Sequence, residues 1–170
     1  LVGSEMCIRD RLSLGSNLGN RYAFLLWAIK EIEKSFDTKS IIANFYETPP
    51  WGKVNQPQFI NTAVYCYTDI PILQCFDKIQ TIEERMKSFK AEKWGPRTID
   101  IDLLFYESDI FRTDDLIVPH HHLHERAFVL KPLQDILPNF IHPLENKTIN
   151  QLIKNVVDDT ILFLKTVDNE

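Results

Sequence analysis

Residues 93–105 (KWGPRTIDIDLLF) restrict the fold more than any other part of the sequence. From Thr98 onward, apolar residues alternate with other residues at the period of a β-strand. Asp100 and Asp102 are therefore expected on one face of the strand, about 7 Å apart along it. The opposite face is apolar and carries Ile99, Ile101 and Leu103. The pattern predicts a sheet that buries this apolar face and leaves both carboxylates outside the core.

Two carboxylates at this spacing raise each other's pKa unless a cation lies between them. Mg²⁺ suits such a pair, because it prefers oxygen ligands and commonly joins one or two carboxylates to substrate phosphates. Trp94 and Arg97 precede the strand, where an indole could stack on a heterocycle and a guanidinium could bind phosphate. The alternative is an edge strand that merely exposes two aspartates. The Trp-Gly-Pro-Arg run favours the phosphate interpretation.

Length, charge and cysteine usage limit the class of protein. A chain of 170 residues predicts one domain, and a net charge of -5 argues against a general nucleic-acid surface. No apolar run reaches the length of a transmembrane helix. The three cysteines (Cys7, Cys66 and Cys75) are scattered without metal-binding spacing, which predicts reduced thiols. We therefore expect a cytoplasmic protein that binds neither nucleic acid nor membrane.

The beginning of the sequence differs in character from the rest of the chain. Arg9-Asp10-Arg11 is a run of charges where the strand at residues 12–14 should extend backward. We predict that residues 1–11 are a leader, either foreign to the natural protein or disordered. Residues 12–170 are then a single domain.

Hydrophobic periodicity predicts the order β-α-β-β-α-β, the split βαβ arrangement with an antiparallel sheet and its helices on one face. Predicted strands cover residues 12–14, 40–46, 58–68 and 98–105, and predicted helices cover residues 21–34 and 71–86. Two more helices (125–133 and 150–156) and a short strand (160–165) complete the chain. Ligands are then expected on the open face of the sheet or at its rim.

Three segments before the second helix carry turn residues or residues that could contact a ring. The run at 15–20 (GSNLGN) predicts a tight turn with Asn20 as the helix N-cap, and a phosphate-binding loop is the weaker alternative. The Pro-rich run at 48–52 either presents backbone groups to a ligand or only connects two strands. Phe59 and Asn61 share a strand face, and could bind a heterocycle or be half-buried structure.

Basic and histidine-rich segments lie on either side of the acidic strand. Residues 87–93 contain three lysines, which could fold over a polyphosphate or be a solvated run of charge. His120 and His124 have the i, i+4 spacing of a helical zinc pair, but Pro119 and the lack of further ligands argue against zinc. We favour His120 as a donor to a phosphate oxygen.

These motifs together resemble a known family. The runs GSNLGN, FYETPPWG, QPQFINTAV, KWGPRTIDIDLLF, VPH and RAFVLKPL occur in the order seen in the 6-hydroxymethyl-7,8-dihydropterin pyrophosphokinases, and the resemblance covers about residues 12–165. It implies an α+β, ferredoxin-like βαββαβ fold with a C-terminal extension. It also implies transfer of pyrophosphate from ATP to the pterin hydroxymethyl group in folate biosynthesis, with release of AMP and with two Mg²⁺.

The resemblance assigns roles to individual residues. The implied catalytic residues are Arg97, Asp100 and Asp102, of which the two aspartates would hold both metals. The implied ATP contacts are Gln80, Glu83, Lys87, Lys90, Trp94, Arg97, Leu103, His120 and Arg126. The implied pterin contacts are Thr48, Pro49, Trp51, Phe59, Asn61, Trp94, Asp100 and Phe128.

The sequence departs from the family pattern at several of its positions. Residues 87–90 (KSFK) stand where the family commonly has a glycine and two arginines, so the positive charge is kept without the planar fork of arginine. Phe59 and His121 stand where tyrosine is frequent, and Asp115 where some members have arginine. Two alternatives remain: a non-catalytic nucleotide or pterin sensor, and a single-stranded RNA-binding module, whose aromatic strand motif and basic surface the sequence lacks. We expect a monomer.

Overall fold

The computed structural model describes residues 8–51, 55–86, 98–156 and 161–166. Its centre is a six-stranded antiparallel sheet with the order β5-β1-β4-β3-β8, in which β2 also pairs with β4. The strands of this sheet are β1 (Ile8–Ser16), β2 (Ser40–Ile42), β3 (Phe45–Thr48), β4 (Phe59–Thr68), β5 (Asp100–Tyr106) and β8 (Leu162–Lys165). The predicted antiparallel sheet is therefore confirmed.

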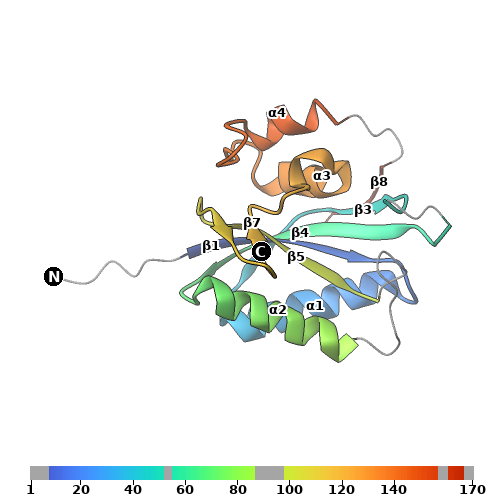
Figure 1. Cartoon of the computed structure of the whole chain (residues 1–170). Helices are drawn as coiled ribbons and strands as arrows, with labels where there is room; N and C mark the ends of the chain where they lie inside the picture. The colour runs from blue at the N-terminus through green and yellow to red at the C-terminus, as the bar shows by residue number, and fades with distance from the viewer. Residues whose placement is uncertain (1–7, 52–54, 87–97, 157–160, 167–170) are drawn as a thin grey trace.

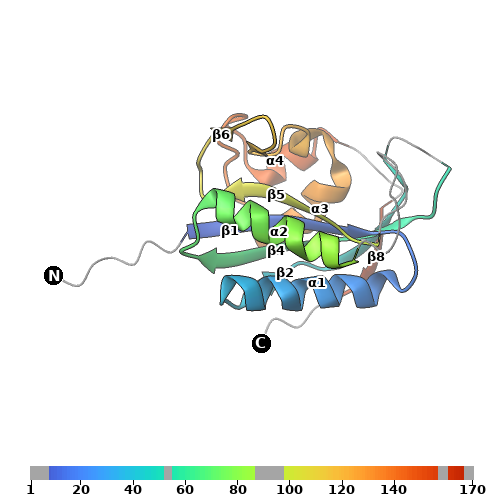
Figure 2. The ribbon, with the colours of Figure 1, turned by 60° about the horizontal axis from the view of Figure 1, so that its bottom comes forward.

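Helices cover both faces of this sheet (Figures 1 and 2). The helices α1 (Arg21–Phe36) and α2 (Ile72–Met86) lie together on one face, as predicted. The helices α3 (Ala127–Ile136) and α4 (Ile149–Ile153), for which the sequence predicted no packing face, lie on the opposite face. The physical reason is that the sheet is apolar on both faces.

Alternation along the central strands explains the two helical layers. On β4, Ile60, Val64 and Cys66 belong to the core cluster beneath α1 and α2, whereas Ala63 belongs to the cluster beneath α3 and α4. On β5, Leu103 and Leu104 divide between the same two clusters. Each apolar cluster is shielded from solvent only when a helical layer packs on its face of the sheet.

The turn before α1 is the predicted helix cap. The Asn20 side chain accepts a hydrogen bond from the Ala23 backbone N–H (3.2 Å), which satisfies one of the free donors of the first turn. Gly19 adopts a positive φ of 58°, a conformation that glycine adopts without strain. The tight-turn interpretation of this run thus holds at Gly19 and Asn20.

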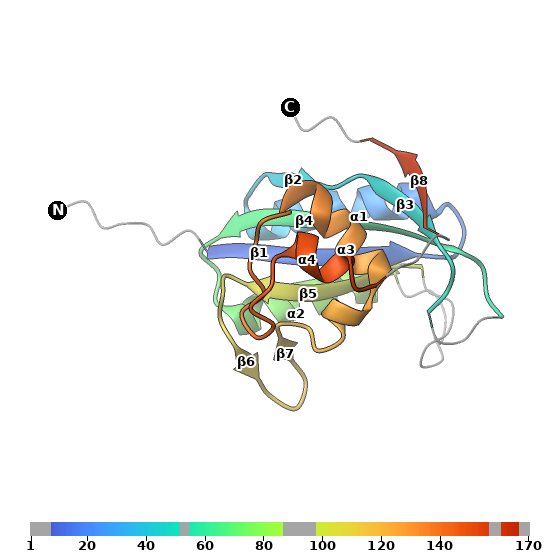
Figure 3. The ribbon, with the colours of Figure 1, turned by 90° about the horizontal axis from the view of Figure 1, so that it is seen from above.

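Three element boundaries differ from the prediction. The strand expected at 40–46 is divided into β2 and β3, because the Asn44 N–H between them donates to the Asp135 carboxylate of α3 (3.2 Å). A short antiparallel pair, β6 (Phe111–Arg112) and β7 (Ile117–Val118), was not predicted and extends beside β5 (Figure 3). A 3₁₀ turn, Leu123–Glu125, replaces the first residues of the helix expected at 125.

The first strand begins earlier than predicted. β1 starts at Ile8 instead of Leu12, and residues 8–11 pair with Thr68 to Tyr65 of β4. Residues 1–7 lie outside the described residues. Residues 8–11 are thus ordered in the sheet, so the expectation of a disordered leader is wrong for them. That residues 1–11 are foreign to the natural protein stays a prediction.

Two further sequence expectations concern the cysteines and the membrane. Cys66 and Cys75 are free, buried thiols, and burial raises the pKa of Cys66 to about 12. Cys7 lies outside the described residues. Across the described parts of the chain, every helix is too short or too polar to cross a bilayer.

Candidate active site

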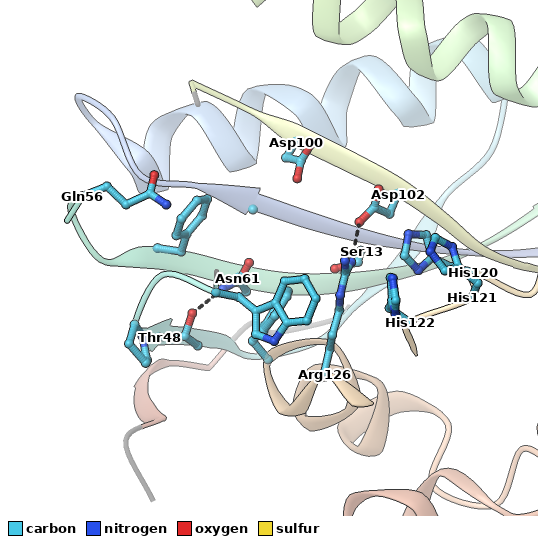
Figure 4. A pocket seen from close by; sticks show the side chains of 15 residues that line it. Ser13, Thr48, Gln56, Asn61, Asp100, Asp102, His120, His121, His122 and Arg126 are labelled. Atoms are coloured by element: carbon cyan, nitrogen blue, oxygen red, sulfur yellow. Dashed lines mark hydrogen bonds and ion pairs between the residues drawn. The ribbon is translucent and has the colours of Figure 1, made fainter. Parts of the chain in front are cut away.

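A cavity of about 470 Å³ opens on the face of the sheet that also carries α3 (Figure 4). Its size is ordinary for a small-molecule site. It is lined by Ser13, Gly15, Thr48, Pro49, Trp51, Gln56, Phe59, Asn61, Asp100, Asp102, His120, His121, His122, Arg126 and Phe128. The strands β1, β3, β4 and β5, the loop after β3, the histidine segment and the start of α3 thus contribute to one site.

The register of the three central strands builds the floor of this cavity. Gly15 of β1 pairs with Asn61 of β4 on one side and with Asp100 of β5 on the other. Two residues earlier, Ser13 pairs with Asp102 on the β5 side. Because side chains two apart share a face, both aspartates face the cavity, as the sequence predicted. Their shared face is confirmed, whereas their metal-binding role stays a prediction.

One end of the cavity is aromatic and holds a buried amide. The Asn61 Nδ2 donates a hydrogen bond of 2.6 Å to the Thr48 Oγ1, which fixes the amide orientation. Gly15 allows this amide to come close, since a Cβ at Gly15 would lie 2.6 Å from the Asn61 Oδ1. The described residues with a predicted pterin contact all line the cavity: Thr48, Pro49, Trp51, Phe59, Asn61, Asp100 and Phe128.

The other end of the cavity is charged. The Arg126 Nη1 lies 3.8 Å from the Asp102 Oδ2, and the Arg126 guanidinium lies 4.4 Å from the centre of the Trp51 ring. Burial, and secondly the charge of Arg126, lower the pKa of His120 to about 4. His120 is therefore neutral at pH 7 and offers one ring N–H to a ligand.

His121 and His122, which follow His120, continue the polar wall of this end toward the loop after β3. The rings of His121 and His122 lie 3.8 Å apart, and the His122 ring lies 5.8 Å from that of Trp51. Burial also lowers the pKa of His121. The His122 Nδ1 lies 3.1 Å from a carboxylate oxygen of Glu125, so this pair holds the histidine against the 3₁₀ turn.

Three predicted ATP contacts lie away from the cavity lining. Gln80 is exposed on α2, and Leu103 is buried in the core beneath that helix. Glu83 accepts a hydrogen bond from the Ile101 N–H (2.8 Å), which ties α2 to the start of β5. Their contacts with ATP stay predictions. Four further predicted residues lie outside the described residues: Lys87, Lys90, Trp94 and Arg97.

The structure adds residues that sequence reasoning did not select. Ser13 could have been found, because it lies two residues before Gly15 on the same strand face. Gln56 had no local signal: it reaches the cavity beside Asn17, whose Nδ2 donates 3.1 Å hydrogen bonds to the Gln56 Oε1 and the Pro57 carbonyl. His122 belongs to the histidine-rich segment, in which the sequence assigned a role only to His120.

The donor set at Asp100 and Asp102 suits Mg²⁺. The pair offers carboxylate oxygens on a cavity wall, and among the described residues no group of three or more His, Cys, Asp or Glu side chains is arranged to hold a metal. A site with two protein carboxylates leaves most coordination positions to water and phosphate oxygens, which is the usual arrangement for Mg²⁺. The residues present therefore fit the metal that the sequence predicted.

The α+β fold places an acidic pair and a buried arginine beside an aromatic pocket with a buried amide. This arrangement suits a transferase that moves a phosphoryl-type group onto a compound with a flat ring. The model of the family described as 7,8-dihydro-6-hydroxymethylpterin-pyrophosphokinase matches residues 11–138. The chain belongs to this family, whose members are pyrophosphokinases of folate synthesis.

Named relatives agree with this membership. The chain is 38% identical over 140 residues to a 2-amino-4-hydroxy-6-hydroxymethyldihydropteridine pyrophosphokinase of Aquifex aeolicus, covering 82% of this chain and 87% of the relative. It is 31% identical over 154 residues to the enzyme of the same name from Haemophilus influenzae, covering 90% and 96%.

Solved structures show the same fold in longer chains. A crystal structure of wild-type Plasmodium falciparum HPPK-DHPS with pteroate matches with a TM-score of 0.71 at 18% identity, covering 91% of this chain and 43% of that one. An HPPK-DHPS in complex with substrates matches with a TM-score of 0.68 at 16% identity, covering 88% and 43%. This chain thus spans less than half of these solved chains, and the likeness concerns the fold.

Proposed function

We propose that the cavity binds ATP beside 6-hydroxymethyl-7,8-dihydropterin and directs the pyrophosphoryl group onto the hydroxymethyl oxygen, with release of AMP. One observation carries this proposal: the acidic pair on β5 and the aromatic amide pocket share one cavity, separated only by β1. The pterin would lie between Phe59 and Phe128, with Asn61 and Thr48 at its polar edge. The phosphates would lie toward His120 and Arg126.

The acidic pair, Asp100 and Asp102, would hold the two Mg²⁺ that the proposed reaction uses. When bound, the metals would neutralise phosphate charge and lower the pKa of the attacking hydroxyl. The protein residues supply position and water exclusion, which are the main requirements of phosphoryl-type transfer. Asp100 and Asn61 both pair with Gly15, so Asp100 is the carboxylate level with the proposed pterin site. It could accept the proton of the attacking hydroxyl group. His120, neutral at pH 7, would donate its ring N–H to a phosphate oxygen.

We also infer that the fold is ferredoxin-like, with α3, α4 and β8 as a C-terminal extension. Support comes from the strand order β5-β1-β4-β3 and from the pairing of α1 and α2 on one face. We also propose that the protein is a monomer and is located in the cytoplasm. Sedimentation at micromolar concentration would test the monomer.

The proposed activity has a direct test. The protein is supplied with ATP, Mg²⁺ and the reduced pterin alcohol, and the nucleotide products are separated. AMP that forms in equal amount to pterin diphosphate supports pyrophosphoryl transfer, whereas ADP would indicate transfer of a single phosphoryl group. Tight ATP binding without any AMP would favour the sensor alternative, in which the lysines at 87 and 90 do not replace the family's arginines.

Gly15→Ala is expected to weaken binding of the pterin about tenfold, since the new methyl group would displace the Asn61 amide from Thr48 and remove about one hydrogen bond. Calorimetric titration with the reduced pterin would measure the change. The nucleotide affinity of the same variant is the control and should stay within twofold. Equal pterin affinity in variant and wild type would contradict the assigned orientation of Asn61.

Arg97→Lys is expected to lower kcat by a factor on the order of ten to a thousand. Lysine keeps the charge but loses the planar fork, and each 1.4 kcal/mol of lost transition-state contact is about tenfold in rate. Arg112→Lys, an exposed position on β6, is the matched control and should retain the wild-type rate. A wild-type rate for Arg97→Lys would remove Arg97 from the phosphate site.

A further inference from the structure

Arg126 is a nearly buried cation at the charged end of the cavity. Its side chain is 7% exposed, whereas that of Asp102 is 33% exposed. The residue precedes α3, and its carbonyl accepts hydrogen bonds from the Val129 and Leu130 N–H groups (3.0 Å each), which fixes the backbone from which the side chain extends. Figure 4 shows the side chain reaching across the cavity to Asp102.

The surroundings leave Arg126 little freedom to retreat into water. The Trp51 ring covers the guanidinium at 4.4 Å, and the Phe128 ring lies 5.8 Å from it. Stacking on aromatic rings is favourable for a guanidinium, which is weakly hydrated. A buried charge still requires a nearby opposite charge, because an unpaired ion loses its hydration without compensation. Asp102 is such a partner in this structure.

The same carboxylate is the proposed metal ligand. Mg²⁺ binds oxygen at about 2.0 to 2.1 Å, so a metal on Asp102 would come within a few ångströms of the guanidinium. Of the described residues that line the cavity, Arg126 is the only lysine or arginine. His120 adds no positive charge at neutral pH, since its pKa is about 4. Among the described residues, Arg126 is therefore the cation that would compete with a divalent ion at Asp102.

We propose that Arg126 is the resident counter-ion of Asp102, and that it lets divalent metal bind tightly only together with a polyphosphate. This inference rests on the proposed metal role of Asp102. Metal alone would take the carboxylate and leave Arg126 buried beside a second cation. A nucleotide removes this conflict, because a phosphate oxygen gives the guanidinium a replacement anion with matching fork geometry. Metal and nucleotide thus enter as a pair.

The test is the affinity of the full chain for Mn²⁺ without nucleotide, measured by electron paramagnetic resonance. Arg126→Gln is expected to bind Mn²⁺ on the order of tenfold more tightly than wild type, a coupling of ordinary size between two sites. The same variant should bind a non-hydrolysable ATP analogue with Mn²⁺ more weakly than wild type. Arg126→Met is a second variant, in case the amide disturbs packing beneath Trp51, and a thermal melt confirms that each variant folds.

Two controls separate the possible failures. Arg126→Lys keeps the charge and should bind Mn²⁺ as weakly as wild type, and so should Arg85→Gln, whose arginine pairs with Glu31 on the helical face away from the cavity. Asp102→Asn should abolish the tight Mn²⁺ binding of Arg126→Gln. If folded Arg126→Gln and Arg126→Met bind Mn²⁺ no better than wild type, the counter-ion inference is overturned. If Mn²⁺ binding does not depend on Asp102, the metal assignment fails as well, whatever the result of the AMP assay.

Discussion

Asp102→Ala is expected to remove turnover while the fold stays intact. The carboxylate lies on the cavity wall in register with Ser13, away from the two apolar clusters of the core. Loss of a metal ligand would remove several kcal/mol of charge stabilisation, which is on the order of a thousandfold or more in kcat. The measurement is AMP formation under saturating ATP, Mg²⁺ and pterin, with circular dichroism to confirm the fold.

A matched control and a second variant make this result specific. Asp109→Ala removes an exposed carboxylate just after the same strand and should leave the rate unchanged. Since Asp102→Ala also deprives Arg126 of a partner, Asp102→Asn should give the same loss of rate with a smaller loss of stability. Near-normal turnover in either Asp102 variant would defeat the metal assignment.

Asp10→Leu is expected to stabilise the protein at neutral pH by an amount on the order of 4 kcal/mol. Burial raises the pKa of Asp10 from 3.8 to about 7, although hydrogen bonding by Cys75 and the charge of Arg11 oppose the rise. The folded state thus favours the neutral carboxyl. At about 1.36 kcal/mol per pH unit, ionisation then costs folding stability between the two pKa values.

The sign of the effect gives a second readout. Below about pH 4 the carboxyl is protonated in both folded and unfolded states, so the ionisation penalty is absent. As the pH rises from about 4 to about 7, wild type should lose stability relative to Asp10→Leu, and above about 7 the difference should stay constant. Urea unfolding at pH 4 and pH 8 would measure this, with Asp77→Asn, an exposed carboxylate on α2, as control. A stability difference that does not change with pH would contradict the buried ionisation.

The sequence predicted those features of the fold that depend on local pattern. Period-2 alternation placed Asp100 and Asp102 on one face, and the Asn20 cap and the run after it placed the start of α1. The division of the second strand depends on Asp135, 91 residues away from Asn44, and no local pattern reports such a contact. The second helical layer was not placed, because local periodicity finds the helices at 125–133 and 150–156 but does not report which face of the sheet they cover.

The candidate site was predicted mainly by motif resemblance, and its missing members show where local reasoning ends. Ser13 was not predicted, although its place two residues before Gly15 on the same strand face would have been enough to select it. Gln56 and His122 reach the cavity through loops, whose paths depend on contacts with Asn17 and Trp51 that form only in the folded chain. Leu103 shows the converse, since its motif position suggested ATP while its alternation assigned it to the core, where the structure places it.

The position of β1 between β4 and β5 has a consequence for which substrates the protein can accept. Asn61 and Asp100 both pair with Gly15, so they stand two strand spacings apart, about 10 Å. Backbone hydrogen bonds set that separation, and loop sequences do not. A compound whose ring edge and reacting oxygen are longer or shorter than this span would miss one end, however well the loops adapted to it. Substrate length is therefore the property least open to change by mutation, whereas the loops can vary and alter only affinity and rate.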